Sequence, residues 1–563
     1  MTMNLRNVLT AAVLFSASWN GFAVTNYWVN NGGFSGTFND GSASSHWDAS
    51  PGGAGGGAAP GASTEVAFDN GQTTPYTVTF SGGITTSVFN VQSDNVVFDL
   101  AGYTWITRLA GFGNPPFNYS DGSRIGNGTS TTGTATVASS AAGGVLRDFL
   151  SAGDFPYYAL GVGYYPGTGS KGTLNINDSL GFGAKVWHRG NLFVGYGYGG
   201  DTGEMTVSGS GSEYFSDYYG EITINGGGTL NVINGAKFTG THNQYFKTAQ
   251  SPEIAYVNVA SGGILQHTFG WYSVYNPSVL SVSSGGTWLA TDVIMGGYRF
   301  YHATNMYVNL TIDGAGSSYR ANNVSLGYGS AGIDGNAQIN VQNGGALSVT
   351  NTLLVRELTP GGVTAGIITN RITLNNGSII LGGSTSTNNG LLEVHGHLRG
   401  VGTISAGTGN PGNFLVSIGD KGQLRAGDIS DTPAIGTLSV TDGDLVVGTG
   451  GASFFDLAAS GAGDLVDITG GSATIGGTLN VNFLGYTPMM NDRWELVTAD
   501  TVTYSGVNNI TAALTPFGLG SHYMLFIEDN GGSQSLVLLI PEPTSLTLLA
   551  LGGLAFLRRR RAS

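Results

Sequence analysis

The fold is decided by a short pattern that is clearest at Ile222–Leu230, where the sequence is ITINGGGTL. Apolar and polar residues alternate until the chain reaches a run of glycines, and the alternation then resumes. A period of two places successive side chains on opposite faces of a β-strand, and glycine adopts the positive φ of a tight turn at little cost. The stretch therefore predicts a strand, a turn and a second strand.

The same pattern recurs along the chain, with its glycines spaced at intervals of roughly 17 to 35 residues. Further copies are 257–265 (VNVASGGIL), 280–288 (LSVSSGGTW), 310–316 (LTIDGAG), 339–347 (INVQNGGAL) and 372–377 (ITLNNG). Coils of a β-solenoid commonly take about 20–30 residues, so one copy fits one coil with a variable loop. A β-sandwich also contains short alternating strands, but it does not explain the recurrence. The prediction is an all-β fold, a right-handed parallel β-helix.

The composition agrees with an all-β fold and argues against a disordered chain. Of the 563 residues 95 are glycine, and only 10% are charged, against ~25% in ordinary soluble domains. The chain also contains 25 Tyr, 26 Phe and 8 Trp, which is more apolar surface than a disordered segment carries. Many short strands joined by tight turns account for both facts.

Charge and cysteine content narrow the function. The formal net charge is −14, without a basic stripe. Because nucleic-acid binding requires clustered Lys and Arg to neutralise phosphates, no nucleic-acid partner is expected. The chain has no cysteine, which excludes thiol nucleophiles, cysteine-ligated zinc and iron–sulfur clusters. We expect no cofactor.

The N-terminal segment 1–23 has the layout of a secretory signal peptide. Arg6 precedes the apolar run 8–15 (VLTAAVLF), and a small-residue exit ends at Ala23. This run is too short to span a bilayer, which takes about 20 apolar residues. We therefore predict export, with cleavage after Ala23.

The C-terminal segment 541–563 begins with a Pro-Glu-Pro tripeptide and continues with the apolar stretch Thr544–Leu557 and an arginine cluster. As a short helix the apolar stretch would measure about 21 Å, against a hydrocarbon core of ~30 Å. It therefore suits a temporary stop in the membrane before processing, with the arginines held on the cytoplasmic side. The residues of this predicted signal are Pro541, Glu542, Pro543, Arg558, Arg559, Arg560 and Arg561.

This tripartite end resembles the PEP-CTERM sorting signal of Gram-negative, biofilm-forming bacteria. The resemblance implies that a membrane transpeptidase, exosortase, is a transient partner that processes the tail. It also implies delivery to the cell envelope, cell surface or extracellular matrix. The repeats from about Gly126 to Gly436 resemble the autotransporter-passenger-like repeats of many such surface proteins.

These patterns divide the chain into five parts. We expect a signal peptide at 1–23, an N-terminal β module with a Gly/Ala-rich loop at 24–125, β-solenoid repeats at 126–436, a C-terminal β cap at 437–540 and the sorting tail at 541–563. A cap is expected because an open solenoid end exposes a strand edge that is prone to aggregate.

Tyrosines crowd the stretch between residues 157 and 219. Exposed aromatic rings can stack on sugar rings, so these side chains are candidates for contact with an extracellular polysaccharide. The candidates are Tyr157, Tyr158, Tyr196, Tyr198, Tyr218 and Tyr219. Packing of tyrosines between neighbouring coils is the alternative interpretation.

We predict neither a catalytic nor a metal site. Glu393, His395 and His397 would share one face if they lay on one strand, but three side chains in a line do not form a closed cage, and an outward polar face explains them equally well. Glycosidases need two carboxylates placed across a bond. The acidic residues instead fall singly at turns, as at Asp313 and Asp442, where Asp caps backbone N–H groups.

Three functions remain open at this point. The first is an exported structural or adhesive protein of the envelope or extracellular matrix. The second is a surface carbohydrate-binding protein that uses the tyrosine-rich coils. The third is a β-helical enzyme that acts on polysaccharides, because parallel β-helices also host such enzymes.

Overall fold

The computed structural model describes much of the chain between the two predicted targeting segments. The described residues are 24–542 without 31–32, 43–44, 110–121, 127–128, 151–158, 165–168, 196–199, 218–220, 242–244, 250–252, 268–270, 275–276, 298–306, 329–335, 358–369, 383–389, 409–413 and 431–432. Ala23 and the tail from Pro543 onward, including the arginine cluster and the predicted short helix, lie outside the described residues.

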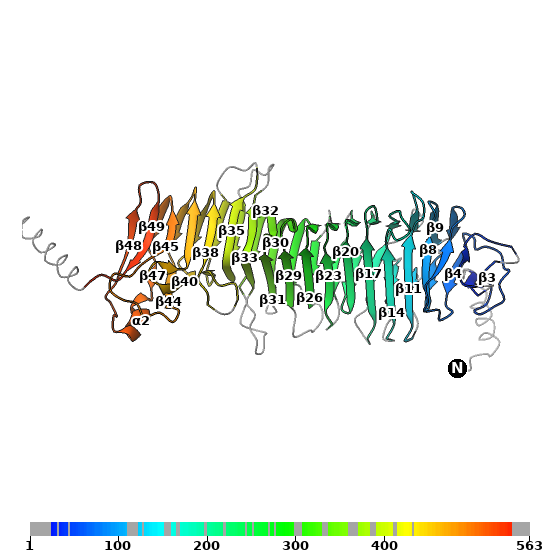
Figure 1. Ribbon diagram of the computed structural model, residues 1–563, viewed down its shortest axis with the longest axis horizontal. Coiled ribbons are helices and arrows are strands. Elements are labelled where there is room, and N and C mark those ends of the chain that lie inside the picture. The colour runs from blue at the N-terminus through cyan, green and yellow to red at the C-terminus, as the bar shows by residue number, and fades with distance from the viewer. Residues whose placement is uncertain are drawn as a thin grey trace, which may run out of the picture. The chain divides into compact units, whose positions relative to one another are not determined.

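The chain forms two compact units. Unit 1 comprises Met1–Tyr256 and Leu265–Phe269, and unit 2 comprises Val257–Ile264 and Gly270–Ser563. The division in the sequence falls at β23 (Ala255–Val259) and β24 (Ile264–His267). Within each unit the strands lie side by side as successive coils (Figure 1).

In unit 1 most strands pair in parallel with the third strand after them, so that each coil contributes one strand to each of three faces. Face A contains β5 (Tyr76–Thr79), β8 (Asn95–Asp99), β11 (Thr132–Ala138), β14 (Lys171–Ile176), β17 (Thr202–Ser208) and β20 (Gly228–Ile233). Face B contains β6 (Ile84–Thr86), β9 (Thr104–Leu109), β12 (Val145–Leu150), β15 (Lys185–His188), β18 (Glu213–Ser216) and β21 (Lys237–Gly240). Face C contains β4 (Thr64–Phe68), β7 (Phe89–Val91), β10 (Arg124–Ile125), β13 (Ala159–Val162), β16 (Asn191–Val194), β19 (Glu221–Asn225) and β22 (Tyr245–Ala249).

The core of unit 1 is a set of apolar ladders that run from coil to coil. On face A, Ala135 pairs with Leu174, Leu174 with Met205, and Met205 with Leu230. All four side chains are buried. Stacking of like side chains in register explains the predicted alternation, because every inward position meets another inward position. The predicted parallel β-helix is confirmed.

Unit 1 begins with an aromatic cluster around β1 (Val24–Trp28), β2 (Gly36–Thr37) and β3 (Trp47–Asp48). The Trp28 and Trp47 rings meet edge to face with centroids 4.9 Å apart, and both rings are fully buried. Trp47 Nε1 donates a hydrogen bond to the Phe38 carbonyl at 2.7 Å. Aromatic burial of this kind stabilises these short strands.

Unit 2 opens with the same arrangement of strands and then changes it. Its first strands are β25 (Trp271–Val274), β26 (Ser278–Ser283), β27 (Thr287–Leu289), β28 (Asp292–Gly297) and β29 (Tyr307–Asp313). Longer strands that turn a corner follow, namely β30 (Ser318–Tyr328), β32 (Ala346–Val355), β33 (Arg371–Leu381) and β35 (His397–Ala406), with the shorter β31 (Asn336–Gln342) between β30 and β32. Register shifts in β30 and β33 mark the corner, as β-bulges do when a strand bends.

The strands after β35, together with β34, again form three faces. The first face contains β34 (Leu391–Val394), β36 (Phe414–Ile418), β39 (Gly443–Val447), β43 (Ser472–Ile475) and β46 (Thr501–Tyr504). The second contains β37 (Gln423–Ala426), β40 (Ala452–Ala459), β44 (Thr478–Phe483) and β47 (Val507–Asn508). The third contains β38 (Thr437–Thr441), β42 (Leu465–Thr469) and β45 (Arg493–Ala499). The short β41 (Ala462–Gly463) pairs with β40.

The last strands of unit 2 are antiparallel. β49 (Gln534–Leu539) pairs with β45 on one side and with β48 (Met524–Asp529) on the other. The helices α2 (Ile510–Leu514) and η1 (Thr515–Phe517) lie between β47 and β48 in the sequence. Among the described residues, none of the helices has both the length and the apolar character needed to cross a bilayer.

The glycine pairs of the repeat serve two different purposes, as Asn343–Gly345 shows. Asn343 and Gly344 have φ of 52° and 84°, the left-handed conformation that a tight turn between β31 and β32 requires. Gly345 is needed for space, because a Cβ there would lie 2.5 Å from the Ile312 carbonyl oxygen of the preceding coil. The first two residues make the turn, and the third lets the coils approach.

The stretch that revealed the fold departs from strict alternation. Ile222, Ile224 and Leu230 are fully buried as expected, but Thr223 and Asn225 are also only 3% exposed. Asn225 Nδ2 donates to the Gly195 carbonyl at 2.8 Å. A polar side chain on the outer side of a strand can therefore be buried when the adjoining chain supplies a hydrogen-bond partner.

Candidate functional site

The first two residues of the predicted sorting tripeptide leave the folded body directly after β49. Ile540 N–H donates to the Asp492 carbonyl at 2.9 Å, and Asn491 N–H donates to the Ile540 carbonyl at 2.6 Å. Pro541 is buried and Glu542 is exposed, and Asn491 Nδ2 donates to Glu542 Oε1 at 2.8 Å. The tripeptide therefore begins as a fixed part of the last sheet.

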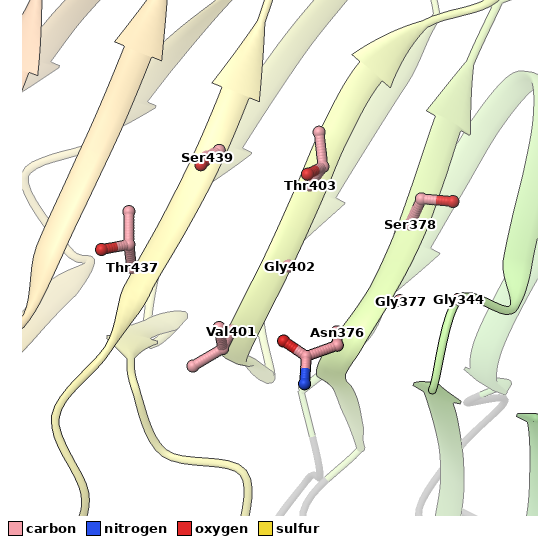
Figure 2. Close-up of a pocket in the computed structure, with 9 residues that line it drawn as sticks. All are labelled: Gly344, Asn376, Gly377, Ser378, Val401, Gly402, Thr403, Thr437 and Ser439. Atoms are coloured by element: carbon pink, nitrogen blue, oxygen red, sulfur yellow. The ribbon is translucent and has the colours of Figure 1, made fainter. Parts of the chain in front are cut away.

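A concavity of about 410 Å³ lies on unit 2 and is a candidate binding site (Figure 2). Its lining residues are Gly344, Asn376, Gly377, Ser378, Val401, Gly402, Thr403, Thr437 and Ser439. They come from the turn before β32 and from β33, β35 and β38. We call this concavity the hydroxyl groove.

Parallel register places the hydroxyl groups of the groove in a row. Ser378 pairs with Thr403, and Thr403 pairs with Ser439. Neighbouring strands of a sheet lie ~4.8 Å apart, so the groove offers a similar polar group at each coil. The side chains of Asn376, Thr403 and Ser439 all line the groove, where their polar atoms can meet a ligand (Figure 2).

The groove follows the bulge in β33. Asn376 has φ of 57°, and the register with β35 shifts between Asn375 and Gly377. A Cβ on Gly377 would lie 2.4 Å from the Val341 carbonyl oxygen, and one on Gly402 would lie 2.5 Å from the Gly377 carbonyl oxygen. These glycines permit the close stacking of bent strands.

The chemistry of the groove is that of neutral hydrogen bonding. Its side chains are hydroxyl, amide and apolar groups, and no charged residue is among those that line it. The hydroxyl groups have no histidine beside them in the lining, so none is arranged as a nucleophile with its base. Such a surface suits an uncharged ligand that is rich in hydroxyl groups.

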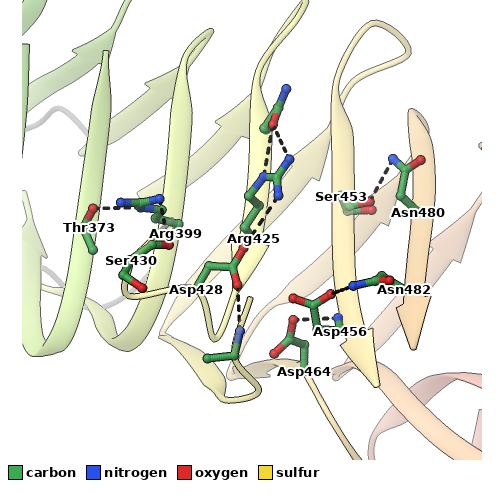
Figure 3. Close-up of polar contacts among 12 residues, drawn as sticks. Thr373, Arg399, Arg425, Asp428, Ser430, Ser453, Asp456, Asp464, Asn480 and Asn482 are labelled. Atoms are coloured by element: carbon green, nitrogen blue, oxygen red, sulfur yellow. Dashed lines mark hydrogen bonds and ion pairs between the residues drawn. The ribbon is translucent and has the colours of Figure 1, made fainter. Parts of the chain in front are cut away.

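A second polar cluster lies at the end of β37 and brings three carboxylates together (Figure 3). Asp428, Asp456 and Asp464 are all buried. Asp464 Oδ1 accepts from Gly436 N–H at 2.9 Å, and its Oδ2 accepts from Asp456 N–H at 2.8 Å. Asp428 Oδ1 accepts from Ala434 N–H at 3.1 Å.

Burial dominates the electrostatics of this carboxylate cluster. It raises the pKa of Asp464 to about 8, with further contributions from the charges of Asp456 and Asp428. Burial is also the largest cause of the raised pKa of Asp456, and the neighbouring Asp428 adds to it. Arg425 Nη1 lies 3.6 Å from Asp428 Oδ2. Because the buried Asp464 carboxyl accepts hydrogen bonds from two backbone N–H groups, its role is to hold these segments of the chain in place.

The sequence did not reveal this cluster, because its members are scattered along the chain and meet only when coils stack. Arg399 extends it, since Nε donates to Thr373 Oγ1 at 3.1 Å and Nη1 donates to the Ser430 carbonyl at 3.0 Å. These contacts fix the segment between β37 and β38 to the neighbouring coils. The only sequence signal for this carboxylate cluster is that isolated Arg and Asp residues occur in a chain with few charged residues.

Unit 1 contains a fully buried pair of Asp148 and His188, which stack in register on face B. His188 Nδ1 lies 3.0 Å from Asp148 Oδ2, and Nε2 lies 3.0 Å from the Asn191 carbonyl oxygen. Asp148 Oδ1 also accepts from the Thr107 and Ser123 hydroxyls. With both side chains wholly enclosed, the pair connects coils within the core.

Glu393, His395 and His397 do not form a row on one strand. β34 ends at Val394 and β35 begins at His397, so a bend separates these residues. His395 Nε2 lies 2.8 Å from Glu393 Oε1, and Nδ1 lies 3.2 Å from the Asp420 carbonyl oxygen. In the described ranges no group of three His, Cys, Asp or Glu side chains could hold a metal ion.

The other predicted site residues can be placed only in part. Pro541 and Glu542 are described above. Outside the described residues lie Ala23, Pro543, Arg558, Arg559, Arg560, Arg561 and the candidate glycan contacts Tyr157, Tyr158, Tyr196, Tyr198, Tyr218 and Tyr219. A neighbouring tyrosine, Tyr164, is described, and its ring stacks on Phe193 with centroids 4.5 Å apart.

Comparison with known proteins assigns the tail. Residues 539–561 match the family described as the PEP-CTERM protein-sorting motif. No curated protein matches the chain. The chain thus carries a PEP-CTERM sorting motif at its C-terminal end, which marks it as an exported, cell-surface-directed protein of Gram-negative-type bacteria that exosortase sorts.

Proposed function

We propose that this protein is a structural or adhesive component of the cell envelope or extracellular matrix, and that its β-helix is the working part. The observation that supports this most is the way unit 2 ends. The parallel coils are followed by the antiparallel strands β45, β49 and β48, and the sorting motif begins at the last residue of β49.

An antiparallel end of this kind limits how the protein associates. It occupies the strand edge of β45, which could otherwise pair with another chain. The outer faces of the coils are further surfaces for contact. On face A, Asn231 Nδ2 donates to Thr206 Oγ1 at 3.2 Å on the preceding coil, so neutral polar ladders cover part of this surface.

A deletion strain tests the proposal. We expect loss of the gene to weaken cell–cell cohesion or the extracellular matrix, and a copy that lacks residues 541–563 to fail in restoring it, because the folded body is no longer sorted. Surface fractionation shows where each form accumulates. Normal cohesion in the deletion strain would contradict a structural role, provided that the parent strain displays the wild-type protein at its surface.

The hydroxyl groove favours a second candidate function, the binding of a neutral extracellular polysaccharide. Its polar groups repeat once per strand at ~4.8 Å, which is close to the length of one sugar unit. Neutral hydroxyls exchange hydrogen bonds with sugar hydroxyls. The tyrosine-rich stretch between residues 157 and 219 remains a predicted second contact.

A glycan array tests this candidate with matched variants. Thr403→Val removes one hydroxyl from the groove and keeps its shape, whereas Thr311→Val makes the same change on the outer side of β29, away from the groove. We expect the first to weaken glycan binding about tenfold, as the loss of a ligand hydrogen bond does, and the second to leave binding unchanged. Equal binding by both variants would exclude the groove.

The proposal assigns the protein no catalytic step. Each carboxyl of the Asp428, Asp456 and Asp464 cluster is engaged with neighbouring chain, and the groove contains no carboxylate. A reducing-end assay on exopolysaccharides tests this directly. Release of new ends by the purified wild-type protein would instead favour the polysaccharide-acting enzyme.

A further inference from the structure

Two adjacent methionines project from the surface beside the root of the tail. They lie on the turn Tyr486–Asp492, which we call the methionine turn. Met489 is 60% exposed and Met490 is 50% exposed. Single exposed apolar side chains are common, but here two large ones are held together on a short turn.

The methionine turn is held in one conformation. Asp492 is buried, and its Oδ2 accepts from Met489 N–H at 2.6 Å and from the Tyr486 hydroxyl at 2.7 Å. Asn491 has φ of 72°, which an asparagine tolerates better than most residues. The fold thus presents the methionines to solvent by a specific set of contacts.

The same turn is bonded to the start of the tail. Asn491 is hydrogen-bonded through its N–H to the Ile540 carbonyl and through Nδ2 to Glu542 Oε1. The apolar stretch begins at Thr544, two residues after Glu542. An extended chain covers at most ~3.5 Å per residue, so the apolar stretch starts within roughly 7 Å of the Glu542 backbone.

We propose that the methionine turn docks on the phospholipid surface while the tail is still in the membrane. This inference rests on the proposed sorting of the tail. When residues 544–557 occupy the bilayer, the short connection brings Met489 and Met490 to the interfacial region, where apolar side chains gain from burial. The turn then fixes the height at which the Pro541–Pro543 segment meets the processing enzyme.

The size and chemistry of the patch favour lipid over a protein partner. Stable protein interfaces bury ~800 Å² on each side, far more than two partly exposed methionines offer. The methionines carry no charge, and the buried Asp492 carboxyl is engaged with the turn itself. A neutral lipid surface is therefore sufficient for docking.

The absence of cysteine from the chain makes a clean test available. Met490→Cys in the tail-retaining chain of residues 24–563 gives a single thiol for an environment-sensitive fluorophore. Ile435→Cys, at another exposed apolar position of 42% exposure, is the matched control. Both proteins are mixed with phosphatidylcholine vesicles, with and without nitroxide-labelled lipid.

We expect the probe at residue 490 to shift its emission to the blue on vesicles and to be quenched by the nitroxide lipid, and the probe at residue 435 to do neither. Met489→Cys should behave as Met490→Cys does. A vesicle-bound protein whose probes at 489 and 490 stay in water would overturn the docking surface and leave tail insertion intact. A protein that fails to bind vesicles would overturn both. If the emission of the probes shifts only when the vesicles also contain exosortase, the methionines contact a protein, and docking on lipid would be refuted.

Discussion

A charge placed in the core of unit 2 tests the fold at one residue. Ile339 in β31 is fully buried and lies in register between Leu310 and Ile372, which are also fully buried. Ile339→Asp removes an apolar side chain worth about 2–3 kcal/mol and encloses a carboxyl without a partner, which costs at least about 2 kcal/mol more. We expect a loss of about 4–6 kcal/mol in the free energy of unfolding.

The neighbouring residue provides the control. Asn340 lies on the outer side of β31, and its Nδ2 donates to Asn309 Oδ1 at 2.8 Å. Asn340→Asp removes that part-buried hydrogen bond, so we expect a loss of about 1 kcal/mol or less. Denaturant midpoints report the difference, and amide hydrogen exchange in the peptides of β29 and β31 localises it. Equal losses for the two variants would refute the assignment of inner and outer positions.

Three other outcomes test separate features of the molecule. Gly345→Ala should destabilise by about 1–3 kcal/mol, because the new Cβ would overlap the Ile312 carbonyl and force the coils apart; Gly61→Ala, which has open space, should be nearly neutral in the same denaturation assay. The pKa of Asp464 is raised to about 8 from 3.8, so between these pH values the folded protein keeps a proton that the unfolded chain loses. The free energy of unfolding should therefore fall as the pH rises from 4 to 8, by up to about 1.4 kcal/mol per pH unit. Asp464→Asn should flatten this pH dependence, and an unchanged slope in the variant would contradict the raised pKa. Intact-mass analysis of the surface form should show a C-terminus near Pro541 without the arginines at 558–561, whereas a mature protein that retains Ser563 would show that the tail is an anchor.

Local patterns of the sequence were sufficient for the strands and turns. Along β31 the residues Ala337, Ile339 and Val341 are buried and the residues between them face outward, as their alternation predicts. The turn at Asn343 and Gly344 was equally predictable, since its φ values are determined by the residues that occupy it. The sorting motif is a linear signal, so the sequence alone identified it.

The pairing of distant residues required the tertiary structure. Glu204 pairs with Thr229 in the next coil, whereas Thr134 pairs with Thr173 across a much longer stretch of chain, because loops of different length intervene. A sequence pattern with so variable a period does not fix which outer side chains stack. The carboxylate cluster of Asp428, Asp456 and Asp464 was missed for this reason.

The sequence by itself determined the class of fold, the inner and outer sides of the regular strands and the address of the protein, since each depends on close neighbours along the chain. Only the tertiary structure decided that β33 bends at a bulge to form the hydroxyl groove, that Thr223 is buried, and that the methionine turn is bonded to Glu542. These features arise where strands from separate coils meet. Hydrogen bonds and steric contacts across that distance have no local period in the sequence.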